Sequence, residues 1–207
     1  MARITVVYYS ATGNVHGLAE ALAEGAESVG AEVRLRRVQE TAPDAAIASN
    51  DAWQSYVTEV APTVEVVSLE DLQWADGFGF GAPTRFGNPA GQLRNFLDTT
   101  GGLWHQGVLD GKAVTSFTSA STYHGGLEST ILALNNTFYH WGAVIVPVGY
   151  ADAELGDSGT PYGASIVGNG DLESVKRGHQ AARVQGARLA KVAAKLAAPD
   201  SQATARA

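Results

Sequence analysis

Short apolar runs alternate along the chain with segments in which apolar residues recur at helical spacing. Residues 3–9 form the first run and are almost continuously apolar, which is typical of a strand buried on both faces of a sheet. In the next segment apolar residues recur at steps of three and four, which predicts an amphipathic helix. These residues are Val15, Leu18, Leu22, Ala26 and Val29. The alternation as a whole predicts a parallel α/β sheet.

Further strands and helices follow from the same pattern. The expected strands are residues 32–38, 76–82, 112–118 and 143–149. The expected helices are residues 69–75, a segment around 93–97, a segment around 127–138, and residues 171–196. Asn88 and Pro89 are expected to be the N-cap and the first-turn residue of the helix around 93–97. A glycine-rich turn is expected at 99–103.

Two of the expected strands carry features of a sheet edge. Residues 32–38 alternate apolar residues with Arg34 and Arg36, and charges protect an edge strand from pairing with other chains. Pro147 lies in the last expected strand and also favours an edge. The sequence therefore predicts an α/β fold, a flavodoxin-like open five-stranded parallel sheet in the order 2-1-3-4-5 with helices on both faces.

A single domain is expected over residues 1–198, with an insertion around 40–67. The insertion contains Pro43 and Pro62 around a stretch rich in Ala, Asp and Asn, and we interpret it as partly helical. Residues 199–207 are polar and are expected to form a disordered tail.

Composition excludes several classes of function. The 207 residues include no Cys, which excludes disulfides, thiolate catalysis, Cys-ligated zinc and iron–sulfur clusters. With 14 Lys and Arg against 21 Asp and Glu, the net charge is -7, so nucleic-acid binding is not expected. The start of the chain lacks the layout of a signal peptide, and no apolar window is long enough for a membrane span. A cytoplasmic protein is therefore expected.

The loop after the first strand is the clearest candidate binding site, because ligands of open parallel sheets bind beyond the carboxyl ends of the strands. Its residues are Ser10, Ala11, Thr12, Gly13, Asn14 and Val15. Hydroxyls, a glycine and the free N–H groups of a helix N-terminus can hold a phosphate without Lys or Arg. Because the Gly-Lys-Ser/Thr sequence of triphosphate-binding loops is missing, a mononucleotide phosphate fits better. The alternative is an ordinary strand-to-helix turn.

Two other loops are expected at the same edge of the sheet. Thr84, Arg85 and Phe86 can support a planar ring, with the Arg85 charge near the polar edge of that ring. The third loop consists of Ala120, Ser121, Thr122, Tyr123, His124 and Gly125. Its hydroxyl and N–H groups can bind either the carbonyls at the pyrimidine end of a flavin or a second ligand above the flavin. The alternative is that Arg85 and His124 are solvated residues of surface turns.

Other candidate residues are less specific. Trp104 follows a glycine-rich segment and can either stack on a flat substrate or anchor the loop, and His140 is interpreted as a helix-end histidine. Glu70 and Asp71 are interpreted as a solvated helix face. The chain has neither a Gly-x-Ser-x-Gly elbow nor a His-Glu-x-x-His motif, so we expect a bound cofactor, and no metal ion, to carry the chemistry.

Residues 6–14 resemble the phosphate loop of flavodoxins. Residues 81–88, 96–104, 144–150 and 159–164, in that order along the chain, resemble the WrbA family of FMN-dependent NAD(P)H:quinone oxidoreductases. The strings Pro-Thr-Arg-Phe-Gly-Asn and Thr-Gly-Gly-Leu-Trp carry most of the specificity. The resemblance implies noncovalently bound FMN, two-electron reduction of quinones by NADH or NADPH, and a homotetramer in equilibrium with homodimers. We expect a ping-pong cycle in which the flavin N5, and no catalytic side chain, carries the chemistry.

Carried onto this chain, the resemblance implies a role for each loop. The FMN phosphate would lie on residues 10–15 and the ring on residues 84–86. The far edge of the ring would meet residues 120–125 and His140, the latter near a subunit boundary. Thr12 would lie near the nicotinamide cofactor. Trp104 would lie near the quinone.

Two parts of the chain depart from the family pattern. Thr12 replaces an aromatic residue, and the third loop is less glycine-rich, so the bulk of Tyr123 and His124 is expected either to narrow the site or to change the choice of substrate. The alternative functions are a flavodoxin-type one-electron carrier and a catalytically silent FMN-binding module. Arg85 and the insertion disfavour the carrier. The sequence leaves open the choice between NADH and NADPH and the identity of the quinone.

Overall fold

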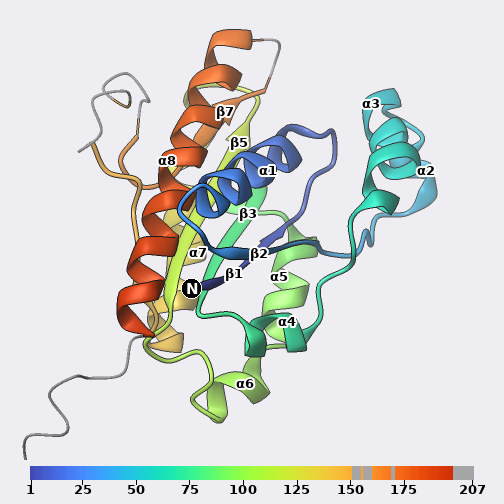
Figure 1. Cartoon of the computed structure of the whole chain (residues 1–207). Helices are drawn as coiled ribbons and strands as arrows, with labels where there is room; N and C mark the ends of the chain where they lie inside the picture. Colours follow the sequence, from blue (N-terminus) through green and yellow to red (C-terminus); the bar gives the residue numbers. More distant parts are fainter. Residues whose placement is uncertain (151–154, 156–159, 169–170, 198–207) are drawn as a thin grey trace, which may run out of the picture.

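The computed structural model describes residues 1–150, 155, 160–168 and 171–197 (Figure 1). The strands are β1 (Arg3–Tyr8), β2 (Glu32–Arg37), β3 (Gly77–Arg85), β4 (Asn88–Pro89), β5 (Ala113–Ala120), β6 (Val144–Ile145) and β7 (Ser165–Val167). The helices are α1 (Asn14–Glu27), α2 (Asp44–Ile47), α3 (Asp51–Ser55), α4 (Leu69–Trp74), α5 (Gly91–Asp98), α6 (Gly101–His105), α7 (Leu127–Trp141) and α8 (Leu172–Leu196), with a π-helical turn η1 (Tyr56–Val60) and a 3₁₀ turn η2 (Ala61–Thr63). The expected tail at 199–207 lies outside the described residues. None of the helices described is long and apolar enough to cross a membrane.

The main sheet is parallel and has the order β2-β1-β3-β5-β6, which confirms the flavodoxin-like topology. The expected fourth strand is β5. The expected fifth strand is regular only at Val144–Ile145, because Pro147 has no N–H with which to continue the ladder. Beyond that point β7 takes the place beside β5, with Thr118 opposite Ser165. The sequence pattern did not predict β7.

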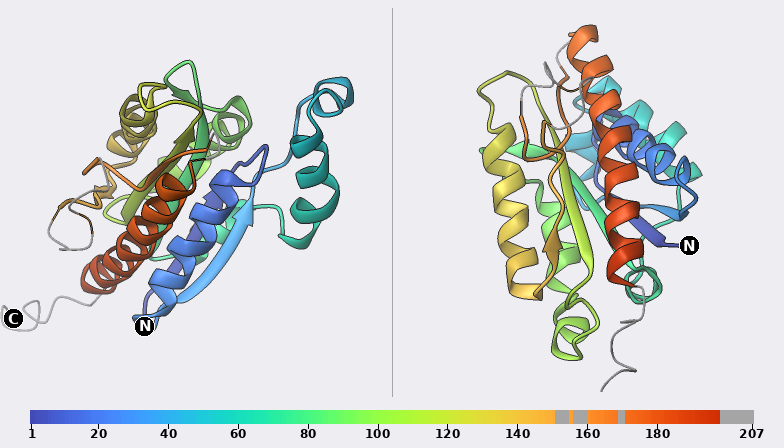
Figure 2. Two further views of the ribbon diagram at one scale, coloured as in Figure 1. Left: turned by 90° about the horizontal axis from the view of Figure 1, so that it is seen from above. Right: turned by 60° about the vertical axis from the view of Figure 1, so that its left-hand side comes forward.

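The alternating Gly-Phe-Gly-Phe-Gly start of β3 divides the sheet into two unlike faces. Gly79 lies on the face covered by α1 and α8, where a Cβ would be 3.1 Å from Leu22. Phe78 and Phe80 belong to the other core, which lies under α4, α5 and α7. Figure 2 shows the resulting three layers, with the sheet in the middle.

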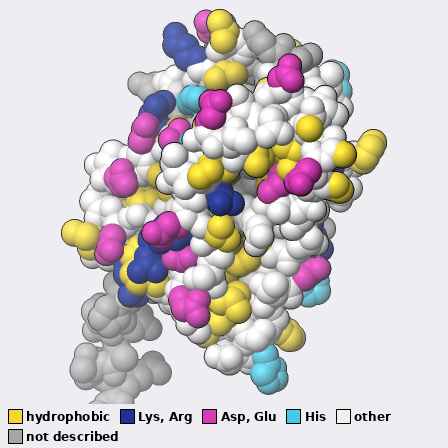
Figure 3. Space-filling view, turned by 90° about the vertical axis from the view of Figure 1, so that its right-hand side faces the viewer, with side chains coloured by type: hydrophobic (Ala, Val, Ile, Leu, Met, Phe, Trp, Pro, Cys, Tyr) yellow, Lys and Arg dark blue, Asp and Glu magenta, His cyan; other side chains and the backbone are white. Residues whose placement is uncertain are grey.

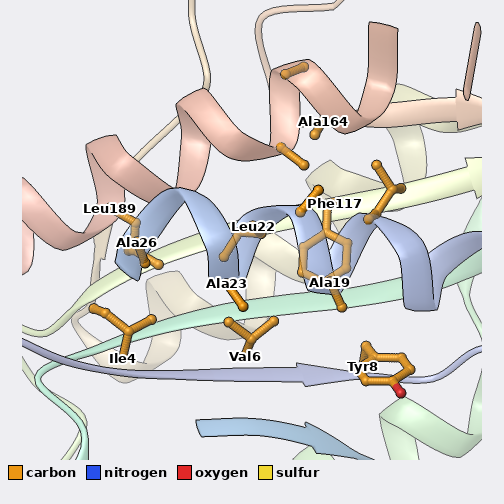
Figure 4. Packing of buried hydrophobic residues seen from close by; sticks show 14 of the residues in the cluster. Ile4, Val6, Tyr8, Ala19, Leu22, Ala23, Ala26, Phe117, Ala164 and Leu189 are labelled. Atoms are coloured by element: carbon orange, nitrogen blue, oxygen red, sulfur yellow. The ribbon is translucent and has the colours of Figure 1, made fainter. Parts of the chain in front are cut away.

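Helices α1 and α8 pack unusually close to each other. A Cβ on Gly25 would overlap the carbonyl oxygen of Arg183, and one on Gly186 would overlap the carbonyl oxygen of Leu22. Small residues such as Ala19, Ala23 and Ala26 fill the space between α1 and the sheet (Figure 4). This packing leaves α1 little freedom to shift, and the N-terminus of α1 follows the candidate phosphate loop.

Asn88 and Pro89 do not start a helix, so the expectation of an N-cap there is wrong. They form β4, which pairs antiparallel with the end of β3 so that Arg85 lies opposite Asn88. The two residues of the turn, Phe86 and Gly87, have φ angles of 52° and 76°, as in a tight two-residue hairpin turn. Helix α5 begins only at Gly91. The expected glycine-rich turn that follows is also partly helical, since it contains α6.

Asp71 is buried, so the interpretation of Glu70 and Asp71 as a solvated face holds only for Glu70. Asp71 is 5% exposed and forms a capping box with Ser68 at the start of α4. Its Oδ1 accepts hydrogen bonds from Arg34 Nη1 at 3.1 Å and from Arg36 Nε at 3.2 Å. Arg34 and Arg36 of β2 therefore connect α4 to the edge strand, in addition to placing positive charge on that edge.

The segment expected as a partly helical insertion contains α2, α3, η1 and η2, and it stands beside β2 and the loop between β1 and α1 (Figures 1 and 2). Arg37 in β2 joins it to the sheet, because its Nε donates to the carbonyl oxygens of Ala61 and Val64. Figure 3 looks onto this side of the molecule, where Lys and Arg side chains lie among Asp and Glu side chains.

Candidate functional site

A cavity of about 340 Å³ opens at the carboxyl ends of β1, β3 and β5. This volume lies within the range of pockets that take small molecules and cofactors. The lining residues are Ser10, Ala11, Thr12, Asn14, Val15, Asn50, Pro83, Thr84, Arg85, Ser119, Ala120, Ser121 and Gly168. All three loops expected at the switch point therefore contribute to one cavity.

The first loop is shaped by Gly13 and by Ser10. Gly13 occupies the N-cap position of α1 with a φ of 91°, in the left-handed region that favours glycine. Its N–H donates to Ser10 Oγ at 3.1 Å, and Ser10 is 4% exposed. No side chain caps α1, and its first turn contains no acidic residue. The N–H groups of that turn, next to Asn14 and Val15 in the cavity wall, are thus available to an anion.

The second loop brings Thr84 and Arg85 to the cavity, and it turns Phe86 outward. Thr84 Oγ1 accepts a hydrogen bond from Thr130 Oγ1 at 2.7 Å, which ties the end of β3 to α7. Arg85 is exposed, and its Nη1 donates to the carbonyl oxygen of Thr84 at 2.9 Å. Phe86 is fully exposed at the hairpin tip and does not line the cavity. This loop therefore places the Arg85 cation in the cavity wall and the exposed Phe86 ring next to it.

The third loop contributes only its first residues to the cavity, Ala120 and Ser121, together with Ser119 at the end of β5. Thr122, Tyr123, His124 and Gly125 are not among the lining residues. The Tyr123 hydroxyl donates a hydrogen bond to the Asp171 carboxylate at the N-cap of α8, and the Tyr123 side chain is 58% exposed. The structure therefore holds Tyr123 against α8 and not in the wall of the cavity.

Trp104 and His140 lie together, away from the cavity of their own chain. Trp104 is in α6 and is 54% exposed, and its Nε1 donates to the carbonyl oxygen of His140 at 2.8 Å. Figure 1 shows α6 at the other end of the sheet from the loop between β1 and α1. Neither residue can reach this cavity within one chain.

Four lining residues were given no role by sequence reasoning, and two of them, Asn50 and Gly168, lie outside the loops that it selected. Pro83 and Ser119 lie near the carboxyl ends of β3 and β5, inside the loops that the sequence places at this edge of the sheet, although they were not among the residues given a role. Gly168 follows β7, and a Cβ there would overlap the side-chain amide of Asn14. Asn50 comes from the insertion, and no local pattern in the sequence indicates that it reaches the cavity.

The lining residues suit a phosphorylated planar ligand. Arg85 is the one charged residue among the described lining residues, so none of these lining residues carries a carboxylate. Hydroxyls of Ser10, Thr12 and Ser121 add hydrogen-bonding groups along the wall. A free helix N-terminus, a single cation and neutral donors together favour an anion with polar edges. The described residues contain no His, Asp or Glu cluster able to hold a metal ion.

Comparison with known proteins identifies the family. Residues 3–155 match the family model described as NADPH-dependent FMN reductase. A protein of Sinorhizobium fredii named NAD(P)H dehydrogenase (quinone) is 44% identical over 204 residues, covering 95% of this chain and 100% of that protein. A protein of the same name from Rhizobium johnstonii is 46% identical, covering 95% of this chain and 100% of that protein. Another from Deinococcus radiodurans is 44% identical, covering 81% of this chain and 84% of that protein.

Solved structures agree with this assignment. The flavodoxin, WrbA-like protein from Agrobacterium tumefaciens superposes with a TM-score of 0.66 at 26% identity, over 94% of this chain and 99% of that one. A flavodoxin from the domain Archaea shares the fold at 18% identity, with a TM-score of 0.60 over 93% of this chain and 99% of that one. The chain therefore belongs to the NADPH-dependent FMN reductase family and, within it, to the WrbA-like NAD(P)H:quinone oxidoreductases.

Proposed function

We propose that this protein binds FMN in the cavity at the carboxyl ends of β1, β3 and β5 and uses NADH or NADPH to reduce quinones by two electrons. The observation that carries the proposal is the uncapped N-terminus of α1 in the wall of a cavity of about 340 Å³, whose lining, as far as the structure describes it, includes Arg85 and no carboxylate. The names of the relatives supply the substrates, and the family supplies the cofactor.

Each loop has its own task in this proposal. The first-turn N–H groups of α1 and the hydroxyls of Ser10 and Thr12 hold the phosphate. Thr84 and Ser121 hydrogen-bond the ring edges, and Arg85 places positive charge beside the ring, where it stabilises negative charge on the cofactor. Bound FMN would supply the redox chemistry, taking hydride at N5 and delivering two electrons to the quinone.

The ping-pong order follows if NAD(P)H and the quinone use the same open side of the cavity in turn. Arg85 and the exposed Phe86 stand at that side and can position either planar substrate. Parallel lines in double-reciprocal plots of rate against quinone at several NADH concentrations would support this order. Intersecting lines would contradict it.

Trp104 and His140 fit the proposal in an oligomer. Because both residues are exposed and lie away from their own cavity, we propose that they contact the quinone or the ring in the cavity of a neighbouring copy, within a homodimer or homotetramer. We also propose that residues 1–198 act as a single domain in the cytoplasm.

The test is an anaerobic titration of the FMN-loaded protein with NADH and, separately, with NADPH, followed by the visible flavin band. The proposal predicts that the band bleaches in a single phase at one equivalent, after which a panel of quinones restores it. Reduction by dithionite but by neither nucleotide would support the one-electron carrier or the silent FMN-binding module. If FMN does not bind, the interpretation of the first loop is wrong.

A further inference from the structure

The insertion contributes one residue to the cavity, Asn50, whose side chain has one end already engaged. Asn50 is the N-cap of α3, and its Oδ1 accepts a hydrogen bond from the Trp53 N–H at 3.1 Å. An amide side chain has one acceptor oxygen and one donor nitrogen. Because the cap uses the oxygen, the Nδ2 group is the end that can serve a ligand in the cavity that Asn50 lines.

Glu40 holds this part of the insertion against the sheet. Its carboxylate accepts hydrogen bonds from the Tyr9 hydroxyl at 2.8 Å, from Trp53 Nε1 at 2.9 Å and from Gln92 Nε2 at 2.9 Å. The backbone N–H groups of residues 41 and 42 donate to the same carboxylate at 2.9 Å. Burial alone would raise the pKa of Glu40, but these hydrogen bonds lower it below its usual value. A charged carboxylate therefore joins the end of β1, the start of α5 and the first turn of α3.

A second contact places the insertion directly on the phosphate loop. Tyr56, in η1, is 6% exposed, and its hydroxyl lies 3.3 Å from the hydroxyl of Tyr8 in β1. A Cβ on Gly13 would lie 3.8 Å from the Tyr56 ring. Gly13 is the N-cap of α1, so the insertion packs beside the end of the cavity where the free N–H groups are. Thr84 and Ser121, which we assign to the ring, belong to other strands and loops.

We propose that the insertion forms the outer wall of the FMN site, with Asn50 Nδ2 donating a hydrogen bond to the phosphate end of the cofactor and Glu40 acting as the positioning residue for Asn50. This inference rests on the proposed function, since it assumes that FMN occupies the cavity. A neutral donor at this position complements the N–H groups of α1 and adds specificity for the phosphate without introducing another cation.

The first experiment compares the binding of FMN and of riboflavin, followed by quenching of flavin fluorescence, in the wild type and in Asn50→Asp. Asp caps a helix as well as Asn does, so α3 is preserved, but the donor becomes an anion beside the phosphate. We expect Kd for FMN to rise about tenfold or more, since a hydrogen bond to a charged group is worth at least that much, while Kd for riboflavin changes less than about twofold. Equal weakening of both ligands, or no weakening of FMN binding, would overturn the role of Asn50.

The second experiment tests Glu40 as a positioning residue. We expect Glu40→Gln to weaken FMN binding about threefold or more, because it replaces a charge-assisted acceptor and loosens α3. In the Asn50→Asp background the same substitution should have little further effect, since Glu40 acts through Asn50. If the losses of FMN affinity from the two substitutions are additive in this double-mutant cycle, Glu40 acts independently of Asn50, and that part of the inference is overturned.

Ser55→Ala is the matched control for both variants. Ser55 ends α3 and its hydroxyl lies 3.2 Å from Glu59 at an exposed position, so the substitution should leave both flavin affinities unchanged. A loss of FMN affinity in this control equal to that of Asn50→Asp would indicate a general loosening of the insertion and count against the inference. Failure of the wild type to bind FMN would instead refute the proposed function. The two failures are therefore distinguishable.

Discussion

The two faces of the sheet are packed with contrasting residues. Under α1 and α8 alanine is the most frequent core residue, and backbones come close enough that a methyl group on Gly25 or Gly186 would overlap a carbonyl oxygen. Under α4, α5 and α7 the core contains an aromatic cluster, with Phe80, Phe138 and Trp141 in mutual ring contact at centroid distances of 5.2–5.7 Å. The same five-residue start of β3 supplies both surfaces, because successive side chains alternate between faces.

The contrast explains how the site is held in place. Close backbone packing fixes α1 relative to the sheet, and the N-terminus of α1 lies at the part of the cavity that we propose binds the phosphate. The aromatic face fills volume and supports α7, whose Thr130 holds Thr84 at the other end of the cavity. Larger side chains should therefore destabilise the face under α1 and α8, and smaller side chains should destabilise the face under α4, α5 and α7.

The largest effect is expected for Phe138→Ala on the aromatic face. Phe138 is completely buried and packs against Phe80 and Trp141, so truncation leaves a cavity that costs about 3–5 kcal/mol of unfolding free energy. Urea denaturation measures the loss. Tyr139→Ala is the control, because Tyr139 is next in sequence but 65% exposed, and it should lose less than about 1 kcal/mol. Similar losses for both variants would contradict the assignment of this core.

Asp71→Asn should cost somewhat less, about 2–3 kcal/mol near neutral pH, because it leaves Arg34 and Arg36 without a buried partner while both remain partly exposed. Burial alone would raise the pKa of Asp71, but the Ser68 N–H and the charges of Arg36 and Arg34 lower it overall. The ionised carboxylate therefore stabilises the fold above the unfolded pKa of about 4, and that contribution is lost as the pH falls through the lower pKa of the folded state.

Denaturation at several pH values should accordingly show that the difference in unfolding free energy between wild type and Asp71→Asn becomes smaller below about pH 4. Glu24→Gln, on the face under α1 and α8, is the control variant. Glu24 pairs with Arg183 at 2.8 Å, but both side chains are more than half exposed, so its loss should stay under about 0.5 kcal/mol. A gap for Asp71→Asn that is independent of pH would show that its charge does not contribute.

Gly186→Ala on the small-residue face should cost about 1–3 kcal/mol, although alanine is the better helix former, because the added methyl must push α8 away from Leu22. The same movement would displace α1, so FMN affinity should fall together with the free energy of unfolding. Thermal denaturation and flavin fluorescence would measure the two effects. A stabilised variant would mean that the helices are not packed this closely.

The smallest effect, of opposite sign, is expected for Gly102→Ala in α6. Apart from its chain neighbours and the backbone of its own helix, no heavy atom of the described residues lies within 4 Å of the position a Cβ would take there. Only helix propensity therefore changes, and a gain of up to about 1 kcal/mol is expected. If Gly102→Ala raises the free energy of unfolding and Gly186→Ala lowers it, the cost of steric overlap is separated from the intrinsic preference of helices for alanine.

Much of the molecule follows from local patterns in the sequence. Apolar runs and helical spacing predicted β1, α1 and the flavodoxin-like strand order, because burial on a sheet or along a helix repeats at fixed intervals. The hydroxyl-rich loop from Ser10 to Val15 could be identified for the same reason, since a helix N-terminus with Gly and Ser is a local feature.

Contacts between distant segments decided the rest. Local sequence predicts that Asp71 is a surface residue, but in the fold Asp71 is buried beside Arg34 and Arg36. Local sequence also predicts that Asn88 is a helix cap, but in the fold Asn88 pairs with Arg85 in a hairpin. Asn50 lines the cavity from the insertion, in which Glu40, 10 positions earlier, accepts a hydrogen bond from Tyr9 at the end of β1. The sequence by itself thus determined the order of the strands, the helices between them and the loop that can receive a phosphate. Only the tertiary structure decided which remote polar groups meet, because such a pairing depends on the three-dimensional path of the chain and leaves no periodic pattern along it.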